Sequence, residues 1–299
     1  MRLSTAIAIP AVCFLISFAA AQSPETHELP PVQPRWKAGD KVRVRQRQEQ
    51  TQRIVMRSGL EVVDEQNVRG GFEQRYVLEV TKVDEKGRIV EAKRTYEALH
   101  DLERGEAVAV DGLVVRWLRD PDGALRWEPP AGATLDRFVR ETLDEDLEGP
   151  DEPGEEGAPD AARLLFSPGK PVAVGETWEL DLAKVAPAFG ISPEDVVKKR
   201  LQGKLVEVEP PAAAGGTAWL KLGLELQLEL KSWEGRVAPR PVEYTITGSA
   251  RLPAGGQGPE RTLRLEAQVR GALPAEEEPG ARIEFDMRQH LLEEQTRVP

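Results

Sequence analysis

The segment LKLGLELQLEL, residues 220–230, carries leucine at every even position. Lysine, glycine, glutamate and glutamine occupy the odd positions between the leucines. Successive side chains of a β-strand point to opposite faces, so this spacing places all the leucines on one side. A helix turns by about 100° per residue and would scatter the same leucines among the glutamates. The segment is therefore predicted to be a long amphipathic strand.

Further alternating segments in the C-terminal part of the chain predict strands over residues 217–231, 242–252, 262–273 and 281–292. Loops of glycine, proline and acidic residues separate these segments, which makes an up-and-down antiparallel meander the expected topology. Strands of this length must twist and curl. We therefore expect a mainly β fold with a few short helices, built on one or more long curved antiparallel sheets that are half-barrel-like.

The N-terminal part of the chain shows the same kind of alternation. Strands are predicted over residues 41–57, 60–68, 71–83 and 88–102, and Ser58-Gly59 is predicted to form the first turn. Even positions of the first strand carry four glutamines, which are candidates for a polar inner surface: Gln46, Gln48, Gln50 and Gln52. Basic residues at its odd positions are typical of protection against edge pairing.

Two short helices are predicted. In residues 134–147 the apolar side chains share one helical face, and Thr134 is a candidate capping residue. Ser192-Pro193 followed by two acidic residues predicts a second helix that runs to about Leu201 and ends at Gly203.

An acidic stretch divides the chain. Residues 149–162 are rich in acidic residues, proline and glycine and are predicted to be a solvated linker. It separates an N-terminal β-rich half, residues 35–148, from a C-terminal antiparallel β half, residues 163–299. A shift of 136 positions aligns Gly39-Asp40 with Gly175-Glu176, so the halves are either related by duplication or share turn chemistry by coincidence.

The first residues predict the compartment. Residues 1–21 have a basic start, an apolar run and an Ala-Ala-Ala cleavage site, which is typical of a signal peptide. Proline-rich residues 22–34 are predicted to be an extended tether. Export to the periplasm or the extracellular space is expected. No second long apolar segment follows, so we expect no transmembrane segment after cleavage, although retention of the segment as an anchor stays an alternative.

Charge and cysteine content narrow the chemistry. The net charge of −11 argues against nucleic acid as a main partner, because nucleic acids bind basic patches. The one cysteine, Cys13, lies in the predicted signal peptide, so disulfides and thiolate catalysis are not expected. The three histidines, His27, His100 and His290, have no metal-binding spacing, and neither a metal site nor a cofactor is predicted.

Two motif matches have competing explanations. Ser167-Pro168-Gly169-Lys170 fits a Ser-x-x-Lys nucleophile motif, but its proline and glycine forbid the helix that this chemistry needs. Acidic residues between Asp144 and Glu155 fall at calcium-loop positions, yet acid-rich linkers produce such matches by chance. No catalytic residue is predicted.

The leucine row must be shielded from water, because an exposed row would cause aggregation. A second sheet, the two helices or a bound apolar ligand are the possible covers. A filled core between the two halves and a ligand cavity therefore both stay open. Should a cavity exist, the candidate lining residues are Leu222, Leu224, Leu226, Leu228, Tyr244, Ile246, Leu265 and Phe285.

Residues 164–230 resemble uncharacterised exported bacterial β-rich proteins that share a Gly-Asp/Glu-Thr-Trp strand start. The matching features here are Pro171, Gly175-Glu176-Thr177-Trp178, Ser192-Pro193 and the leucine-rich strand. The layout more remotely resembles the half-barrel of periplasmic lipoprotein carriers, in which a bent sheet and short helices enclose acyl chains. This resemblance implies a shape and no residue role, since no functional residue of the carriers matches.

These observations favour an exported, non-enzymatic protein that binds a lipid, another hydrophobic ligand or a cell-envelope partner on a curved sheet. One alternative is a structural or assembly protein of the cell envelope that acts through strand edges or the acidic linker. A hydrolase with an unrecognised carboxylate site is a further alternative.

Overall fold

The computed structural model describes residues 25–29, 36–120, 123–147, 165–166, 168–189, 191–213, 215–255, 259–275 and 280–298. The predicted signal peptide, the predicted acidic linker and Ser167 lie outside these ranges. Part of the predicted tether is described and is not free. Its residues Thr26–His27 form a short strand, β1, and Leu29 packs against the C-terminal core because its side chain is apolar.

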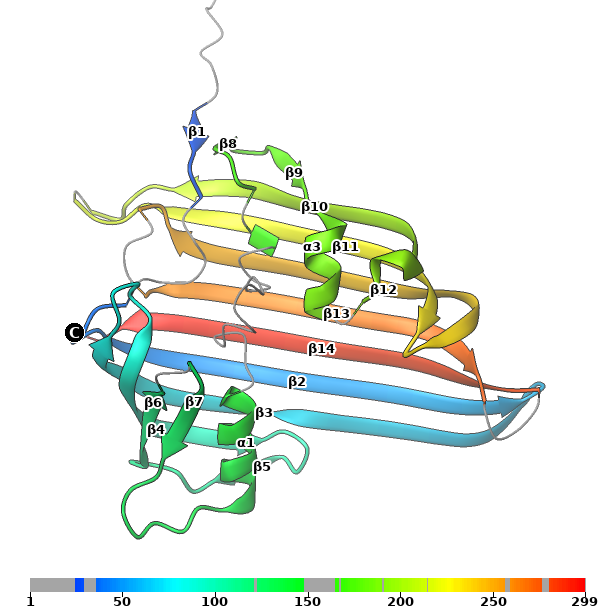
Figure 1. The fold of residues 1–299 in the computed structure, drawn as a ribbon, viewed down its shortest axis with the longest axis horizontal. Helices are drawn as coiled ribbons and strands as arrows, with labels where there is room; N and C mark the ends of the chain where they lie inside the picture. The colour runs from blue at the N-terminus through cyan, green and yellow to red at the C-terminus, as the bar shows by residue number, and fades with distance from the viewer. Residues whose placement is uncertain are drawn as a thin grey trace, which may run out of the picture.

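A long antiparallel sheet dominates the molecule (Figure 1). Its N-terminal strands are β2 (Lys41–Ser58), β3 (Glu61–Val83), β4 (Ile89–Asp101), β5 (Glu106–Val108), β6 (Val114–Arg119) and β7 (Leu125–Glu128). Its C-terminal strands are β9 (Thr177–Glu179), β10 (Val196–Glu209), β11 (Trp219–Trp233), β12 (Arg236–Pro253), β13 (Arg261–Pro274) and β14 (Ala281–Arg297). A separate pair joins β1 to β8 (Val172–Ala173). The prediction of a mainly β, antiparallel fold is confirmed.

The two halves of the sequence build one sheet. The strand order is β7-β6-β4-β3-β2-β14-β13-β12-β11-β10-β9, and β5 pairs with β4 beside this path. β11 to β14 form the predicted meander and β10 extends it by one strand. The last strand, β14, pairs with β2 along seventeen residue pairs from Ala281↔Ser58 to Arg297↔Val42. A core in which the halves pack face to face is therefore wrong, because the halves join edge to edge. The sheet is open, with β7 and β9 at its edges.

The sheet has two chemically different faces. The apolar face carries the even residues of β2, β3, β11 and β12 and the odd residues of β13 and β14, as the cross-strand registers require. Two buried clusters occupy this face. One lies against the leucine row and the other lies near α1 (Arg137–Leu147). The opposite, charged face is covered by cross-strand ion pairs such as Arg270–Asp286 at 3.0 Å.

The segment after Ser192 is a strand and not the predicted helix. Pro193–Asp195 makes a single 3₁₀ turn, η3, and β10 begins at Val196. Leu201 and Leu205 are four residues apart, a spacing that fits one face of a helix and one face of a strand equally well. Pairing with residues 219–230 of β11 and the β-branched start of β10 outweigh the local helix-start signal.

Two other boundaries differ from prediction. α1 begins at Arg137, where Asp136 accepts a hydrogen bond from the Phe138 N–H at 2.8 Å, so Asp136 takes the capping role expected of Thr134. Residues 60–68 and 71–83 belong to one long strand, β3, instead of two. Gly71 allows this continuity. Its φ is 122°, and its backbone passes so close to the Gln48 carbonyl that a Cβ at this position would overlap with it.

The predicted similarity of the halves has a structural counterpart in two turns. The Asp40 N–H donates to the Lys37 carbonyl and the Glu176 N–H donates to the Ala173 carbonyl, each at 3.0 Å. In each turn the acidic side chain also accepts a hydrogen bond from the backbone of the first turn residue. The Lys37 N–H donates to Asp40 Oδ2 at 2.8 Å, and the Ala173 N–H donates to Glu176 Oε2 at 2.9 Å. Both turns use a glycine with positive φ, Gly39 at 90° and Gly175 at 84°.

The strand beside each turn repeats the same arrangement. The Gly39 N–H donates a hydrogen bond to the Val80 carbonyl at 2.8 Å, and the Gly175 N–H donates one to the Leu205 carbonyl at 2.7 Å. The pairing of β3 with β4 is interrupted directly after Val80, and the pairing of β10 with β11 is interrupted directly after Leu205. Both halves therefore share the turn and an interruption in the strand beside it, and their relation by duplication stays a prediction.

Candidate functional site

The leucine row is covered by the segment that precedes β10. Leu165, Phe166, Val172 and residues of β9, α3 (Leu182–Val185) and η2 (Ala186–Phe189) lie in the same cluster as the row. Figure 1 shows α3 in front of the strands that carry this cluster. The cover is therefore a layer from the chain's own C-terminal half, which is not one of the covers expected from the sequence. Six buried leucines contribute up to roughly 9–18 kcal/mol of apolar burial.

The structure brings the eight predicted lining residues together on one face. Seven of them are buried in the C-terminal cluster, with exposed fractions of 1% for Leu222, 6% for Leu224, 0% for Leu226, 4% for Leu228, 7% for Tyr244, 1% for Ile246 and 9% for Phe285. The eighth, Leu265, is half-buried at the border of the cluster. Their role in contacting a ligand stays a prediction.

An aromatic group closes one end of the leucine row. The Trp233 ring lies 6.0 Å from the Tyr244 ring and 6.5 Å from the Phe285 ring, and Phe189 of the covering layer lies 6.3 Å from Tyr244. Burial among these rings raises the pKa of Tyr244 to about 12, because the phenolate is poorly solvated there.

The apolar face continues past the covering layer. Four half-buried apolar residues of β13 and β14 border the buried cluster, and we call them the central strip: Leu265, Ala267, Met287 and Leu291. The registers place Leu265 opposite Leu291 and place Ala267 and Met287 on the same face. The strip occupies the middle of the sheet, between the part covered by α3 and the part near α1 (Figure 1). It is part of the apolar surface that the covering layer leaves accessible on this face.

A row of amides borders the central strip on its β2 side. Gln48 lies opposite Leu291, Gln50 opposite Gln289 and Gln52 opposite Met287. The Gln52 amide reaches the Met287 sulfur at 3.5 Å, and farther along the face Gln74 donates to Gln46 at 3.0 Å. The predicted polar inner surface of glutamines therefore lies on the same face as the leucines, directly beside apolar side chains.

Sequence reasoning did not assign Ala267, Met287 or Leu291 to the site. The signal for them is in β14, where the inward positions alternate between apolar and polar residues along Met287, Gln289, Leu291 and Glu293. Such a mixed strand predicts a face that is buried only in part.

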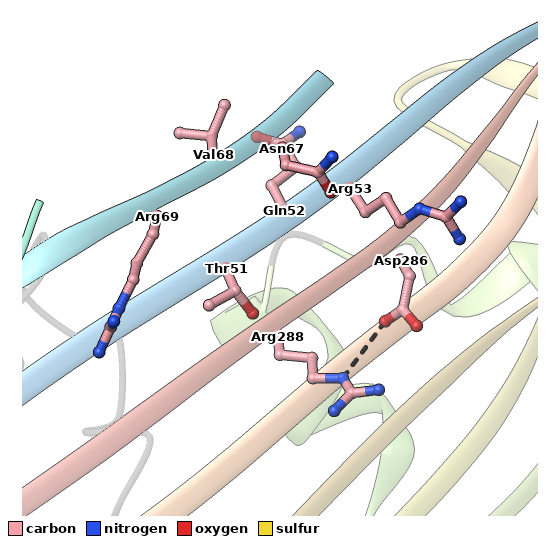
Figure 2. Close-up of a pocket in the computed structure, with 8 residues that line it drawn as sticks. All are labelled: Thr51, Gln52, Arg53, Asn67, Val68, Arg69, Asp286 and Arg288. Atoms are coloured by element: carbon pink, nitrogen blue, oxygen red, sulfur yellow. Dashed lines mark ion pairs between the residues drawn. The ribbon is translucent and has the colours of Figure 1, made fainter. Parts of the chain in front are cut away.

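The charged face contains a hollow of about 380 Å³ over β2, β3 and β14. Figure 2 shows its lining residues around the small side chain of Thr51: Gln52, Arg53, Asn67, Val68, Arg69, Asp286 and Arg288. Arg53 pairs with Glu65 at 2.9 Å and Arg69 with Glu49 at 2.7 Å, while Arg288 lies 3.5 Å from Asp286. The hollow carries a single carboxylate and so does not supply the pair that a hydrolase needs.

Polar contacts at the hollow shift the pKa values of two carboxyl groups, Glu49 beside it and Asp286 in its lining. Hydrogen bonds from Arg47 and then Arg69 lower the pKa of Glu49. At Asp286 burial raises the pKa, but hydrogen bonds from Gln268 and Arg288 outweigh it and leave the pKa below its ordinary value. Both carboxylates are therefore anionic at neutral pH and balance part of the arginine charge.

The described residues contain no group of three or more His, Cys, Asp or Glu side chains arranged to hold a metal ion. His290 lies on the charged face, 4.0 Å from Glu266. Within the described ranges, no helix has the length and apolar character needed to cross a membrane.

Comparisons with known proteins give no family for this chain. Neither a family model nor a curated protein matches it. A solved structure from work on lipid–protein interactions in lipovitellin aligns with 88% of this chain and 26% of its own, at 10% identity and a TM-score of 0.31. The chain thus spans about a quarter of that protein, and a likeness this low carries no argument here. The resemblance to exported bacterial proteins stays a prediction.

Proposed function

We propose that this protein is a non-enzymatic binding protein that holds a hydrophobic ligand of the acyl-chain class on the central strip. The observation that carries the proposal is the half-exposure of Leu265, Ala267, Met287 and Leu291 directly beside a fully buried core. Apolar side chains that adjoin a core and stay accessible are typical of ligand grooves and contact surfaces.

The shape of the strip fits an extended chain. From Leu263 to Val269 the strand β13 covers six residue steps, roughly 20 Å at about 3.3 Å per residue. A linear ligand lying along the strand contacts Leu265 and Leu291 at one point and Met287 farther on. The amides of Gln48, Gln50 and Gln52 lie beside this path and can hydrogen-bond a polar end group.

The buried leucine row supports this surface. Leu224 and Gly248 are cross-strand neighbours, and Gly248 in turn pairs with Leu265. A Cβ at position 248 would press on the Leu265 and Leu224 side chains, so this glycine sets the depth at which Leu265 sits. The row therefore holds the strip in place, and Leu265 is the predicted lining residue that contacts the ligand in this proposal.

The same proposal includes export: the protein would bind its ligand in the periplasm or outside the cell. The support is the signal-peptide pattern of residues 1–21. Expression of the full chain in a bacterium, followed by fractionation and N-terminal sequencing of the product, tests it. A mature protein that begins at Gln22 in the periplasm or medium supports export, and a cytoplasmic protein that retains Met1 contradicts it.

Adjacent leucines of β14 provide a matched test of ligand binding. Leu291 lies on the central strip, whereas Leu292 lies on the charged face opposite Arg264 and Arg47, and both are half-buried. The protein is purified without detergent, extracted with organic solvent and titrated with a fluorescent fatty-acid probe. We expect co-purifying acyl lipid, with probe affinity lowered about tenfold or more by Leu291→Gln and little changed by Leu292→Gln. Absence of lipid together with absence of probe binding overturns the proposal.

A further inference from the structure

The first half of β3 is an uncovered sheet edge. β4 pairs with β3 only from Phe72 onward, and among the described residues no strand pairs with the outer side of Glu61–Gly70. Figure 1 shows this end of β3 running along the rim of the sheet beside β2. Its apolar side chains are exposed, Val62 to 45%, Val63 to 54% and Val68 to 52%, and so is Leu60 of the adjoining turn, to 95%. A long, accessible edge with valines is a template for pairing with another strand.

Hydrogen bonds farther along β3 show which residues of the free edge point their N–H and C=O groups away from β2. Val80 exchanges bonds with Asp40 and Gly39, on the β2 side. The β2–β3 register is unbroken from Lys41↔Glu79 to Met56↔Asp64, so even residues of β3 point their N–H and C=O groups at β2. Odd residues point outward, as the bond from the Leu102 N–H to the Gly71 carbonyl shows. The outward groups of the free edge therefore belong to Val63, Glu65, Asn67 and Arg69.

We propose that the free edge of β3 pairs antiparallel with the same edge of a second copy of this chain, with the two-fold axis at Glu65. In this register Glu65 faces its symmetry mate and Val63 faces Asn67, which matches the outward N–H and C=O groups on both strands. Val62 then lies opposite Val68 and Glu61 opposite Arg69, each twice. An axis at Val63 sets Val62 against Asp64 and Glu61 against Glu65. An axis at Asn67 pairs Glu65 with Arg69, but it sets Val68 against Gln66 and runs the partner strand into Phe72, which already pairs with β4.

The arginine-lined hollow adds charge complementarity to this arrangement. Asn67, Val68 and Arg69 contribute to both the hollow and the free edge. A partner glutamate opposite Arg69 places its carboxylate at the β3 side of the hollow, whereas Arg288 lies on the β14 side with Thr51 of β2 between them (Figure 2). The two Glu65 carboxylates at the axis are each held by Arg53 of their own copy at 2.9 Å, which reduces their mutual repulsion.

A single-cysteine experiment tests the axis. The sequence has one cysteine, so Cys13→Ser gives a background without any thiol. Directly opposed residues in a hydrogen-bonded antiparallel pair have Cα atoms about 5.5 Å apart, within the range that a disulfide spans. Glu65→Cys should therefore form a covalent dimer on mild oxidation. Asn67→Cys should not, because the axis separates it from its mate by four residue steps, about 13 Å.

Charge reversal tests the register. Glu61→Arg should weaken dimerisation at least tenfold in sedimentation equilibrium, and so should Arg69→Glu. An equimolar mixture of these two variants should recover heterodimers, since each opposed pair is then one arginine and one glutamate. Glu85→Arg, an equal charge change in the exposed turn at the other end of β3, should have little effect. A monomeric chain at every concentration, a mixture that stays monomeric, or a cross-link that forms at position 67 and not at 65 would overturn the proposal.

Discussion

The indole of Trp178 on β9 lies over Gly203 on β10, its direct cross-strand partner, and occupies the space that a side chain at 203 would fill. This contact joins the covering layer to the sheet, because Trp178 belongs to the cluster that contains the leucine row. The glycine is thus required by packing. Its φ is not in the left-handed region, so any residue could adopt the backbone conformation.

Gly203→Ala should destabilise the protein by about 1–3 kcal/mol, because the new methyl group overlaps the Trp178 ring and forces the covering layer outward. Urea denaturation followed by tryptophan fluorescence measures the change. Gly70→Ala is the matched control, since Gly70 is also a strand glycine but has open space at its Cβ position. Equal stability of the two variants would show that Trp178 does not pack on Gly203.

Leu226→Ala should cost about 2–5 kcal/mol, because Leu226 is fully buried in the middle of the leucine row and its truncation leaves a cavity. Leu60→Ala, at the exposed β2–β3 turn, should change stability by less than about 0.5 kcal/mol. Thermal and urea unfolding report both values. A small loss at Leu226 would contradict the burial of the row beneath the covering layer.

The stability of the protein should decrease above pH 10 partly because of Tyr244. Its pKa in the folded state is about 12 against an ordinary value of 10.0, so the unfolded chain releases this proton first. The contribution is fully present below pH 10 and is lost as the pH rises toward 12, on the order of 2 kcal/mol. Tyr244→Phe keeps the aromatic packing and should flatten this part of the pH–stability curve. Identical alkaline slopes for the variant and the parent protein would contradict the burial of the phenol.

The Arg261–Glu293 ion pair, at 2.7 Å, should matter more than the exposed pairs of the sheet, because both side chains are largely buried. Glu293→Gln removes the compensating charge and should cost about 3 kcal/mol. Glu234→Gln, whose contact with Arg236 is 3.6 Å and largely exposed, should cost less than about 1 kcal/mol. Chemical denaturation of both variants gives the comparison, and a similar cost for the two would show that burial does not set the value of the pair.

The sequence predicted the sheet well wherever alternation was long. β2 and β11 to β14 were all predicted as strands, because period-two patterns over ten or more residues are hard to mistake for a helix; the start of β12 and the end of β14 extend beyond the predicted bounds. Short signals were less informative. Ser192-Pro193 is a good helix start in isolation, but fourteen residues of pairing and packing on β11 determine the structure of β10.

The candidate site was predictable only in part. The face that carries Leu222 and Leu265 followed from alternation, whereas the border between covered and accessible apolar residues depends on where residues 165–189 pack. No local pattern encodes that placement. Nor could the join between β14 and β2 be read from the sequence, because it links strands more than 200 residues apart through backbone hydrogen bonds that any side chain permits.

Methionine methyl NMR tests the binding of an apolar ligand most directly. Beyond Met1, the chain has Met56 and Met287, and only Met287 lies on the central strip. With methyl-labelled methionine, titration with dodecanoate below its micelle concentration should shift the Met287 resonance in a saturable way and leave Met56 nearly unchanged. A Met287 resonance that does not move at saturating dodecanoate, or a shift confined to Met56, would contradict the assignment of the ligand to this strip.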